Sequence, residues 1–113
     1  MKNILMLFVL MMFSECSSAG FNTGNELAEM MSEAEKLDSD NSKDVSEVGG
    51  YYGYVTGVAD ATDYGIWCAP SHLKSAQIVK VVSKYLNNNP EKLHLNAAQL
   101  VIEALIGAFP CKK

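Results

Sequence analysis

Apolar residues recur at the three- and four-residue spacing of an amphipathic helix in four separate segments of this chain. We expect these helices to cover approximately residues 24–37, 45–63, 75–87 and 95–108. The first helix begins at a capping box, because the Thr23 hydroxyl and the Glu26 carboxylate can each accept a hydrogen bond from the other residue's backbone N–H. The pattern therefore predicts an all-α fold of about four packed helices.

The apolar stripes predict which face of each helix is buried. In the first two segments they consist of Leu27, Met30, Met31, Ala34 and Leu37, and of Val48, Tyr51 or Tyr52, Val55, Val58 or Ala59, and Thr62. In the third, Ile78, Val81, Val82 and Tyr85 form the predicted inner face, with Val79 and Leu86 on its flank. The core stripe of the fourth is Ala97, Leu100, Val101, Ala104, Leu105 and Ala108. Ile102 and Ile106 add a second strip there, so this helix is either central to the domain or half used in an oligomer contact.

The second segment has small residues at a regular spacing. Gly53, Gly57 and Ala61 lie four residues apart, which places them on one helix face. Each glycine costs about 1 kcal/mol relative to alanine inside a helix, so this spacing predicts a neighbouring helix that approaches closely. We expect Asp60 of the same segment to bond backbone or tyrosine groups at the following helix junction.

Two polar connectors separate the apolar segments. Residues 38–44 are acidic but lack the glycine and the closing glutamate of a calcium-binding loop, so they predict a solvated loop. Residues 87–92 contain three asparagines and Pro90, which cannot continue the preceding helix.

Residues 1–19 have the features of a secretory signal peptide: Lys2, an apolar run over 4–13, and small residues before Gly20. The run is too short for a stable membrane span, which needs about 20 apolar residues. Lipidation of Cys16 is the alternative, although Glu15 stands where a small residue is wanted. We therefore expect the mature chain to be one domain, residues 20–113, without an integral membrane segment.

Cys68 and Cys111 are the two cysteines of that mature chain. An exported protein meets oxidising conditions, so a structural disulfide between them is the expected state. We expect Trp67, in the turn before Cys68, to cover this bond.

The charge balance limits the possible partners. The net charge is −4, the nine basic residues are all lysine, and the acids gather in the first half while most lysines lie in the second. Without arginine for base and phosphate recognition, nucleic acid is excluded as a partner. The charge asymmetry allows either two halves that complement each other within one fold or an acidic partner-binding face.

No constellation for catalysis or metal binding stands out. Cys68, His72 and Asp60 could supply a nucleophile, a base and an orienting group, but Cys68 has an oxidised partner in Cys111. His72 and His94 do not have the spacing of zinc ligands, and His94 is interpreted as a capping or packing residue before the last helix. We expect neither catalytic residues nor a cofactor.

Several short motifs follow one another in an order typical of a known family. They are residues 23–27 (TGNEL), 51–61 (YYGYVTGVADA), 68–70 (CAP), 77–82 (QIVKVV), 85–86, 90–91, 93–94, 98, 100–101, 104–105 and 108–111 (AFPC). Over residues 21–111 the chain resembles the Tai-like immunity proteins. These are exported helical proteins that protect bacteria against peptidoglycan amidases delivered by type VI secretion.

The resemblance implies a homodimer and steric inhibition, in which a surface loop occludes the active-site cleft of the amidase. Members often carry a second cysteine pair, and Met31 and Tyr51 stand in its place here. The expected partner-binding residues lie in the two connectors: Asn87, Asn88, Asn89, Glu91 and Lys92 in one, and Asp38 and Asp40 in the other.

The leading hypothesis is thus a periplasmic immunity protein that binds and inhibits a peptidoglycan amidase effector. The alternative is a general exported envelope or scaffold protein of the same domain family without a toxin partner. Neither hypothesis makes the protein an enzyme.

Overall fold

Four α-helices make up the part of the chain that the computed structural model describes, residues 22–36 and 45–112, and this part contains no β-strand. In chain order they are α2 (Gly24–Lys36), α3 (Val45–Thr62), α4 (Ser75–Asn88) and α5 (Ala97–Ala108), with the 3-10 turn η1 (Pro90–Lys92) before α5. The all-α prediction is confirmed, and every predicted helix end lies within two residues of the observed one. The predicted signal peptide and the acidic connector with Asp38 and Asp40 lie outside the described residues.

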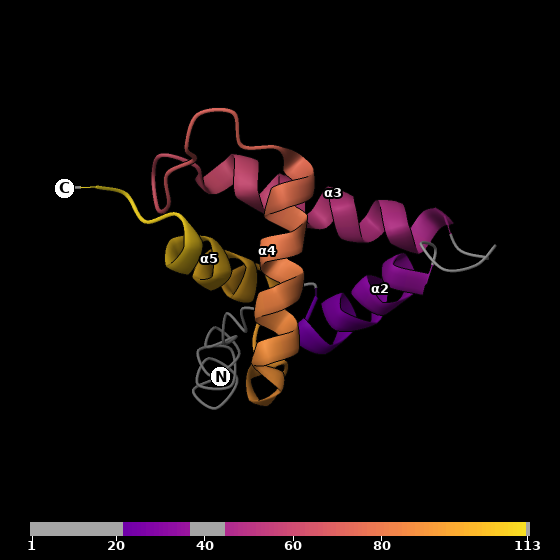
Figure 1. Cartoon of the computed structure of the whole chain (residues 1–113). Helices are drawn as coiled ribbons and strands as arrows, with labels where there is room; N and C mark the ends of the chain where they lie inside the picture. The colour runs from indigo at the N-terminus through magenta and orange to yellow at the C-terminus, as the bar shows by residue number, and fades with distance from the viewer. Residues whose placement is uncertain (1–21, 37–44, 113) are drawn as a thin grey trace, which may run out of the picture.

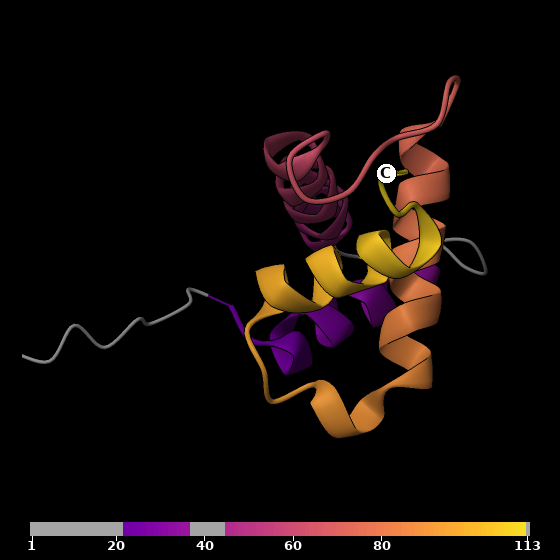
Figure 2. The ribbon, with the colours of Figure 1, turned by 90° about the vertical axis from the view of Figure 1, so that its left-hand side faces the viewer.

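The hydrophobic core is arranged around α5. Its buried residues are Ala97, Leu100, Val101, Ala104 and Leu105. Every helix contacts every other, and Figure 1 shows α4 in front, with α5 on its left, α2 on its right and α3 passing behind its upper part. Figure 2 looks onto α5, with α2 behind it and α4 along one side. Of the two roles predicted for the most apolar helix, the central one is confirmed. Within the described ranges, no helix is both long and apolar enough to span a membrane.

The first helix starts at the predicted capping box. The Thr23 backbone N–H donates to the Glu26 carboxylate at 2.6 Å, and the Glu26 N–H donates to the Thr23 hydroxyl at 3.4 Å. The last helix is capped by Asn96, whose side chain accepts from the Ala98 N–H at 3.0 Å. His94, interpreted as a capping or packing residue, is exposed and is not the cap.

The starts of α2 and α5 are joined through their backbones. The hydrogen bonds run from Gly24 N–H to Leu95 O (2.8 Å), from Asn25 N–H to Leu93 O (2.8 Å) and from Ala97 N–H to Asn22 O (3.0 Å). These bonds satisfy N–H groups that a helix start leaves without intrahelical partners. They also bring the two segments so close that a Cβ on Gly24 would lie 2.7 Å from the Leu93 carbonyl oxygen. Only glycine fits there without a shift of the backbone.

The buried face of α4 differs from the prediction by a small rotation. The buried residues are Val79, Val82 and Leu86, whereas Tyr85, assigned to the inner face, is half-buried. The reason is chemical, because the Tyr85 hydroxyl needs polar partners and finds them in Glu103 and Lys92 near the surface. The two residues predicted to lie on the flank therefore take core positions.

The small residues of α3 do not receive a neighbouring helix. The buried stripe of α3 is Tyr51, Val55 and Ala59, and Gly53 and Gly57 lie on the other side of the helix. No atom of the described neighbours lies within 4 Å of a Cβ built on either glycine, and Ala61 is exposed. The prediction of a close helix approach is wrong, because the larger apolar residues determine which face of α3 turns inward.

Two glycine substitutions compare the closely packed position Gly24 with the open position Gly57. Gly24→Ala should lower the free energy of unfolding by about 2 kcal/mol, because the methyl group overlaps backbone atoms. Gly57→Ala should raise it by up to about 1 kcal/mol, because alanine favours the helix and the site is open. Urea denaturation followed by circular dichroism measures both changes. Equal effects of the two substitutions would contradict the packing described.

Candidate functional site

The loop between α3 and α4, residues 63–74, carries the most exposed large apolar side chains among the described residues. Tyr64 is 76% exposed and Ile66 is 49% exposed. Pro70, Ser71 and His72 are exposed as well, and Figures 1 and 2 show the loop projecting beyond the helices. Exposed aromatic and aliphatic side chains on a projecting loop are typical of a protein-binding surface.

Asp63 holds both ends of the first turn of this loop. One oxygen of its carboxylate accepts hydrogen bonds from the N–H groups of Tyr64 and Ala69, both at 2.9 Å. The Tyr64 backbone has a φ of 59°, a left-handed conformation that is uncommon outside glycine. The aspartate assigned to the helix junction by sequence was Asp60, which is exposed. That assignment is wrong by one helical turn, since it is Asp63 that meets the backbone of the turn.

Trp67 attaches the α3–α4 loop to the helices. Its side chain is buried, and its indole N–H donates to the Thr62 hydroxyl at 2.9 Å. The Trp67 ring packs on the Phe109 ring, with centroids 6.0 Å apart, and the Cys68 N–H donates to the Phe109 carbonyl at 3.0 Å. The tryptophan that we expected beside the disulfide thus joins the loop to the end of α5.

The predicted disulfide is present between Cys68 and Cys111, whose Cα atoms lie 4.8 Å apart. It ties the α3–α4 loop covalently to the segment after α5. The bond also removes the thiol from the hypothetical set of Cys68, His72 and Asp60, so that set cannot act as a nucleophilic triad. In the part of the chain that the structure describes, no cluster of three histidine, cysteine or acidic residues could hold a metal ion.

The connector between α4 and α5 is polar and partly engaged with its own helices. Asn87, Asn88 and Glu91 are exposed, whereas Asn89 and Lys92 are half-buried. The Asn89 amide donates to the Tyr85 carbonyl at 2.8 Å. Sequence reasoning placed partner contacts at these five residues, but the structure gives two of them internal bonds.

Lys92 belongs to a small polar network on the outer side of α4 and α5. Its ammonium donates to the Tyr85 hydroxyl at 3.0 Å and to the Glu103 carboxylate at 3.2 Å, and it lies 5.6 Å from the centre of the Tyr85 ring. The Gln99 amide donates to the other Glu103 oxygen at 3.0 Å. Hydrogen bonds from Tyr85, Gln99 and Lys92, named in the order of their effect, lower the pKa of Glu103 to about 2. The network holds the connector against α5.

The two loops therefore differ in what they offer a partner. The α3–α4 loop presents apolar anchors on a covalently fixed frame, while the α4–α5 connector presents amides and one carboxylate. The sequence analysis interpreted residues 64–70 only as a turn and did not predict a binding surface there. The sequence does contain an indication, because Tyr64 and Ile66 are large apolar residues in a segment that lacks the spacing of a buried helix face.

Fold and site together define a class: a small all-helical protein that a disulfide clamps, with an exposed loop suited to binding another protein. The chain belongs to the Rap1a immunity proteins, whose family model matches residues 23–111. This is a type VI secretion immunity family, and membership implies a role in immunity against a type VI effector. No curated protein matches the chain.

Removal of the disulfide should weaken the fold substantially. The bond closes a loop of 43 residues, and the chain-entropy relation assigns about 4 kcal/mol to a loop of that length. We expect the Cys68→Ala/Cys111→Ala variant to lose about that much unfolding free energy in urea. A reduced wild-type sample is the control, and a loss below about 1 kcal/mol in both samples would contradict the clamp.

The Glu103 network predicts a specific dependence of stability on pH. The folded-state pKa of about 2 lies below the ordinary value of 4.5, so the charged carboxylate stabilises the fold above pH 4.5 and this contribution is lost as the pH falls towards 2. Glu103→Gln should cost about 1 kcal/mol at pH 7, and the difference from wild type should shrink across that interval in urea titrations. Glu91→Gln, at an exposed position, is the control and should change the unfolding free energy by less than about 0.5 kcal/mol at every pH. A difference between Glu103→Gln and wild type that stays constant down to pH 2 would refute the role given to the charged Glu103 carboxylate.

Proposed function

We propose that this protein is a periplasmic immunity protein, exported by its N-terminal signal peptide, that binds and sterically inhibits a peptidoglycan amidase effector delivered by type VI secretion. Family membership supports the immunity role. The resemblance to Tai-like proteins supports the amidase as target. Peptidoglycan lies in the periplasm, which makes that compartment the place where protection is needed.

The observation that carries the inhibitory mechanism is the exposure of Tyr64 and Ile66 on a fixed loop. A binding loop that is already ordered loses little conformational entropy on association. The Asp63 hydrogen bonds, the Trp67 anchor and the Cys68–Cys111 bond all restrict this loop. Such a loop can enter a concave active site and exclude the substrate without any reaction.

The α4–α5 connector, with Asn87, Asn88, Asn89, Glu91 and Lys92, is the second candidate contact. It follows α4 whereas the α3–α4 loop precedes it, and the 14 residues of α4 separate the two by about 20 Å. One narrow cleft cannot take both, so we assign the cleft to the α3–α4 loop and a peripheral polar contact to the connector.

We further propose a homodimer that uses the outer strip of α5. Ile106 is 41% exposed and Ile102 is half-buried. Burial of these side chains against a second copy would remove apolar surface from water.

The test begins with affinity capture of partners from the periplasm, followed by inhibition assays on the peptidoglycan amidase recovered. Tyr64→Ala should weaken inhibition roughly 30-fold, the loss expected for a central aromatic anchor. Tyr52→Ala is the matched control, because Tyr52 is also an exposed tyrosine (41%) but lies on α3 outside the loop. Thermal melting of both variants shows that the fold is retained.

Full amidase activity at saturating protein would sink the immunity proposal and leave a general envelope or scaffold protein. A different result would be that Tyr64→Ala still inhibits fully whereas Asn88→Ala/Glu91→Ala does not. In that case the α4–α5 connector, and not the α3–α4 loop, would occupy the amidase cleft.

A further inference from the structure

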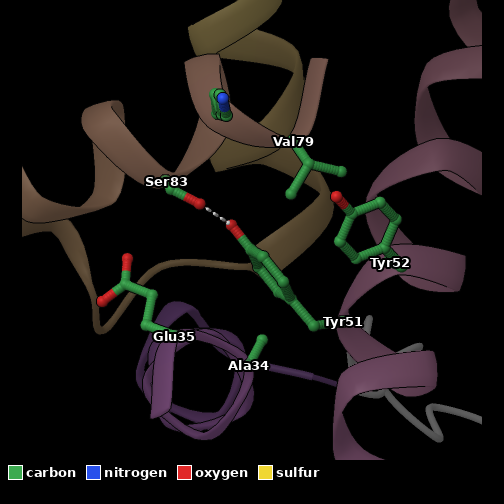
Figure 3. A pocket seen from close by; sticks show the side chains of 7 residues that line it. Ala34, Glu35, Tyr51, Tyr52, Val79 and Ser83 are labelled. Carbon is green, nitrogen blue, oxygen red and sulfur yellow. Dashed lines mark hydrogen bonds between the residues drawn. The ribbon is translucent and has the colours of Figure 1, made fainter. Parts of the chain in front are cut away.

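A groove of 590 Å³ lies where α2, α3 and α4 meet, away from the α3–α4 loop. Its walls are Ala34 and Glu35 from α2, Tyr51 and Tyr52 from α3, and Val79, Lys80 and Ser83 from α4. The volume is within the range of about 300–1,000 Å³ typical of small-molecule sites. Figure 3 shows the Tyr51 side chain crossing the groove, with Glu35 on one side in this view and Tyr52 and Val79 on the other.

The floor of the groove is polar. The Tyr51 hydroxyl and the Ser83 hydroxyl are hydrogen-bonded at 2.6 Å, and either can be the donor. Burial is the main cause that raises the pKa of Tyr51 to about 12, so this hydroxyl keeps its proton at any physiological pH. Tyr51 is only 1% exposed, so when its O–H donates to Ser83, the Ser83 O–H is the one left to donate to a bound molecule.

The two sides of the groove carry opposite charges. Glu35 stands on α2 and Lys80 on α4, both are exposed, and neither forms an ion pair with another described residue. The Glu35 carboxylate acts on the Tyr51 hydroxyl through its charge, and Figure 3 shows it on the same side as the Tyr51–Ser83 pair. The groove thus has an anionic side next to its hydroxyl floor and a cationic side on α4.

The lining between these charges is apolar. Ala34, Val79 and the Tyr52 ring supply it. The α2 and α4 helices are in contact, so Glu35 and Lys80 border the same groove from two sides. An extended peptide spans about 3.3–3.6 Å per residue, so the two ends of a tripeptide are about 10 Å apart.

We infer that this groove binds short peptides with free ends, the ammonium group at Glu35, the carboxylate at Lys80 and small apolar side chains between them. A backbone carbonyl of the peptide accepts from the Ser83 hydroxyl, which the buried Tyr51 hydroxyl holds in place. The inference is independent of the proposed inhibition of an amidase, because it concerns another surface and can be tested on the protein alone.

The probe is trialanine, titrated into the oxidised, ¹⁵N-labelled protein and followed by two-dimensional NMR. Saturable shifts are expected at the amides of the lining residues. N-acetyl-trialanine lacks the ammonium group and trialanine amide lacks the carboxylate, so each should bind about threefold to tenfold more weakly than trialanine.

Variants assign each charge to its end of the peptide. Glu35→Gln should weaken the binding of trialanine but leave N-acetyl-trialanine unchanged, and Lys80→Gln should weaken trialanine but leave the amide unchanged. Glu29→Gln on α2 and Lys84→Gln on α4 are matched controls, since both residues are exposed and lie outside the groove lining. The spectrum of each free variant verifies its fold.

Three results would overturn the inference: no saturable shift with trialanine, equal binding of all three peptides, or control variants that weaken binding as much as Glu35→Gln and Lys80→Gln. The last result would mean that general charge attraction, and not the groove, holds the peptide.

Discussion

The bond between Cys68 and Cys111 is the constraint on which the exposed end of the molecule depends. It joins the loop that follows α3 to the segment that follows α5, so the central helix and the projecting loop cannot move independently. The Trp67–Phe109 ring contact and the Cys68–Phe109 backbone hydrogen bond reinforce the same junction. A loop with exposed Tyr64 and Ile66 would otherwise lose conformational entropy on meeting a partner, and this junction removes much of that cost in advance.

The other end of the molecule is held without a covalent bond. There the first and last helices are held together by backbone hydrogen bonds between the starts of α2 and α5. The capping box orders the start of α2, and Gly24 allows the close approach because it has no side chain. Met31 of α2 and Tyr51 of α3 are both buried in the core. Packing of such side chains holds α2 against α3 without a covalent bond.

The surface chemistry separates into three regions with different properties. The α3–α4 loop presents exposed Tyr64 and Ile66, and the disulfide ties it to the end of α5. The α4–α5 connector is polar and partly bonded to its own helices, and the groove beside Tyr51 combines two charges with a pair of hydroxyl groups. An immunity protein needs only one of these regions to block an effector. The groove shares Tyr51 and Val79 with the core, whereas Glu35, Lys80 and Ser83 give it its polar chemistry.

The sequence by itself determined the number of helices, their ends to within two residues, the capping box and the disulfide, because each depends on local spacing or on a single pair of residue types. Tertiary structure decided which residues of α4 turn inward, since that depends on where the Tyr85 hydroxyl finds Glu103. It also decided that Gly53 and Gly57 face away from every described helix, and that Asp63 rather than Asp60 meets the loop backbone. The exposed loop escaped sequence analysis for the same reason: whether Tyr64 is buried or presented to a partner depends on contacts between segments far apart in the chain.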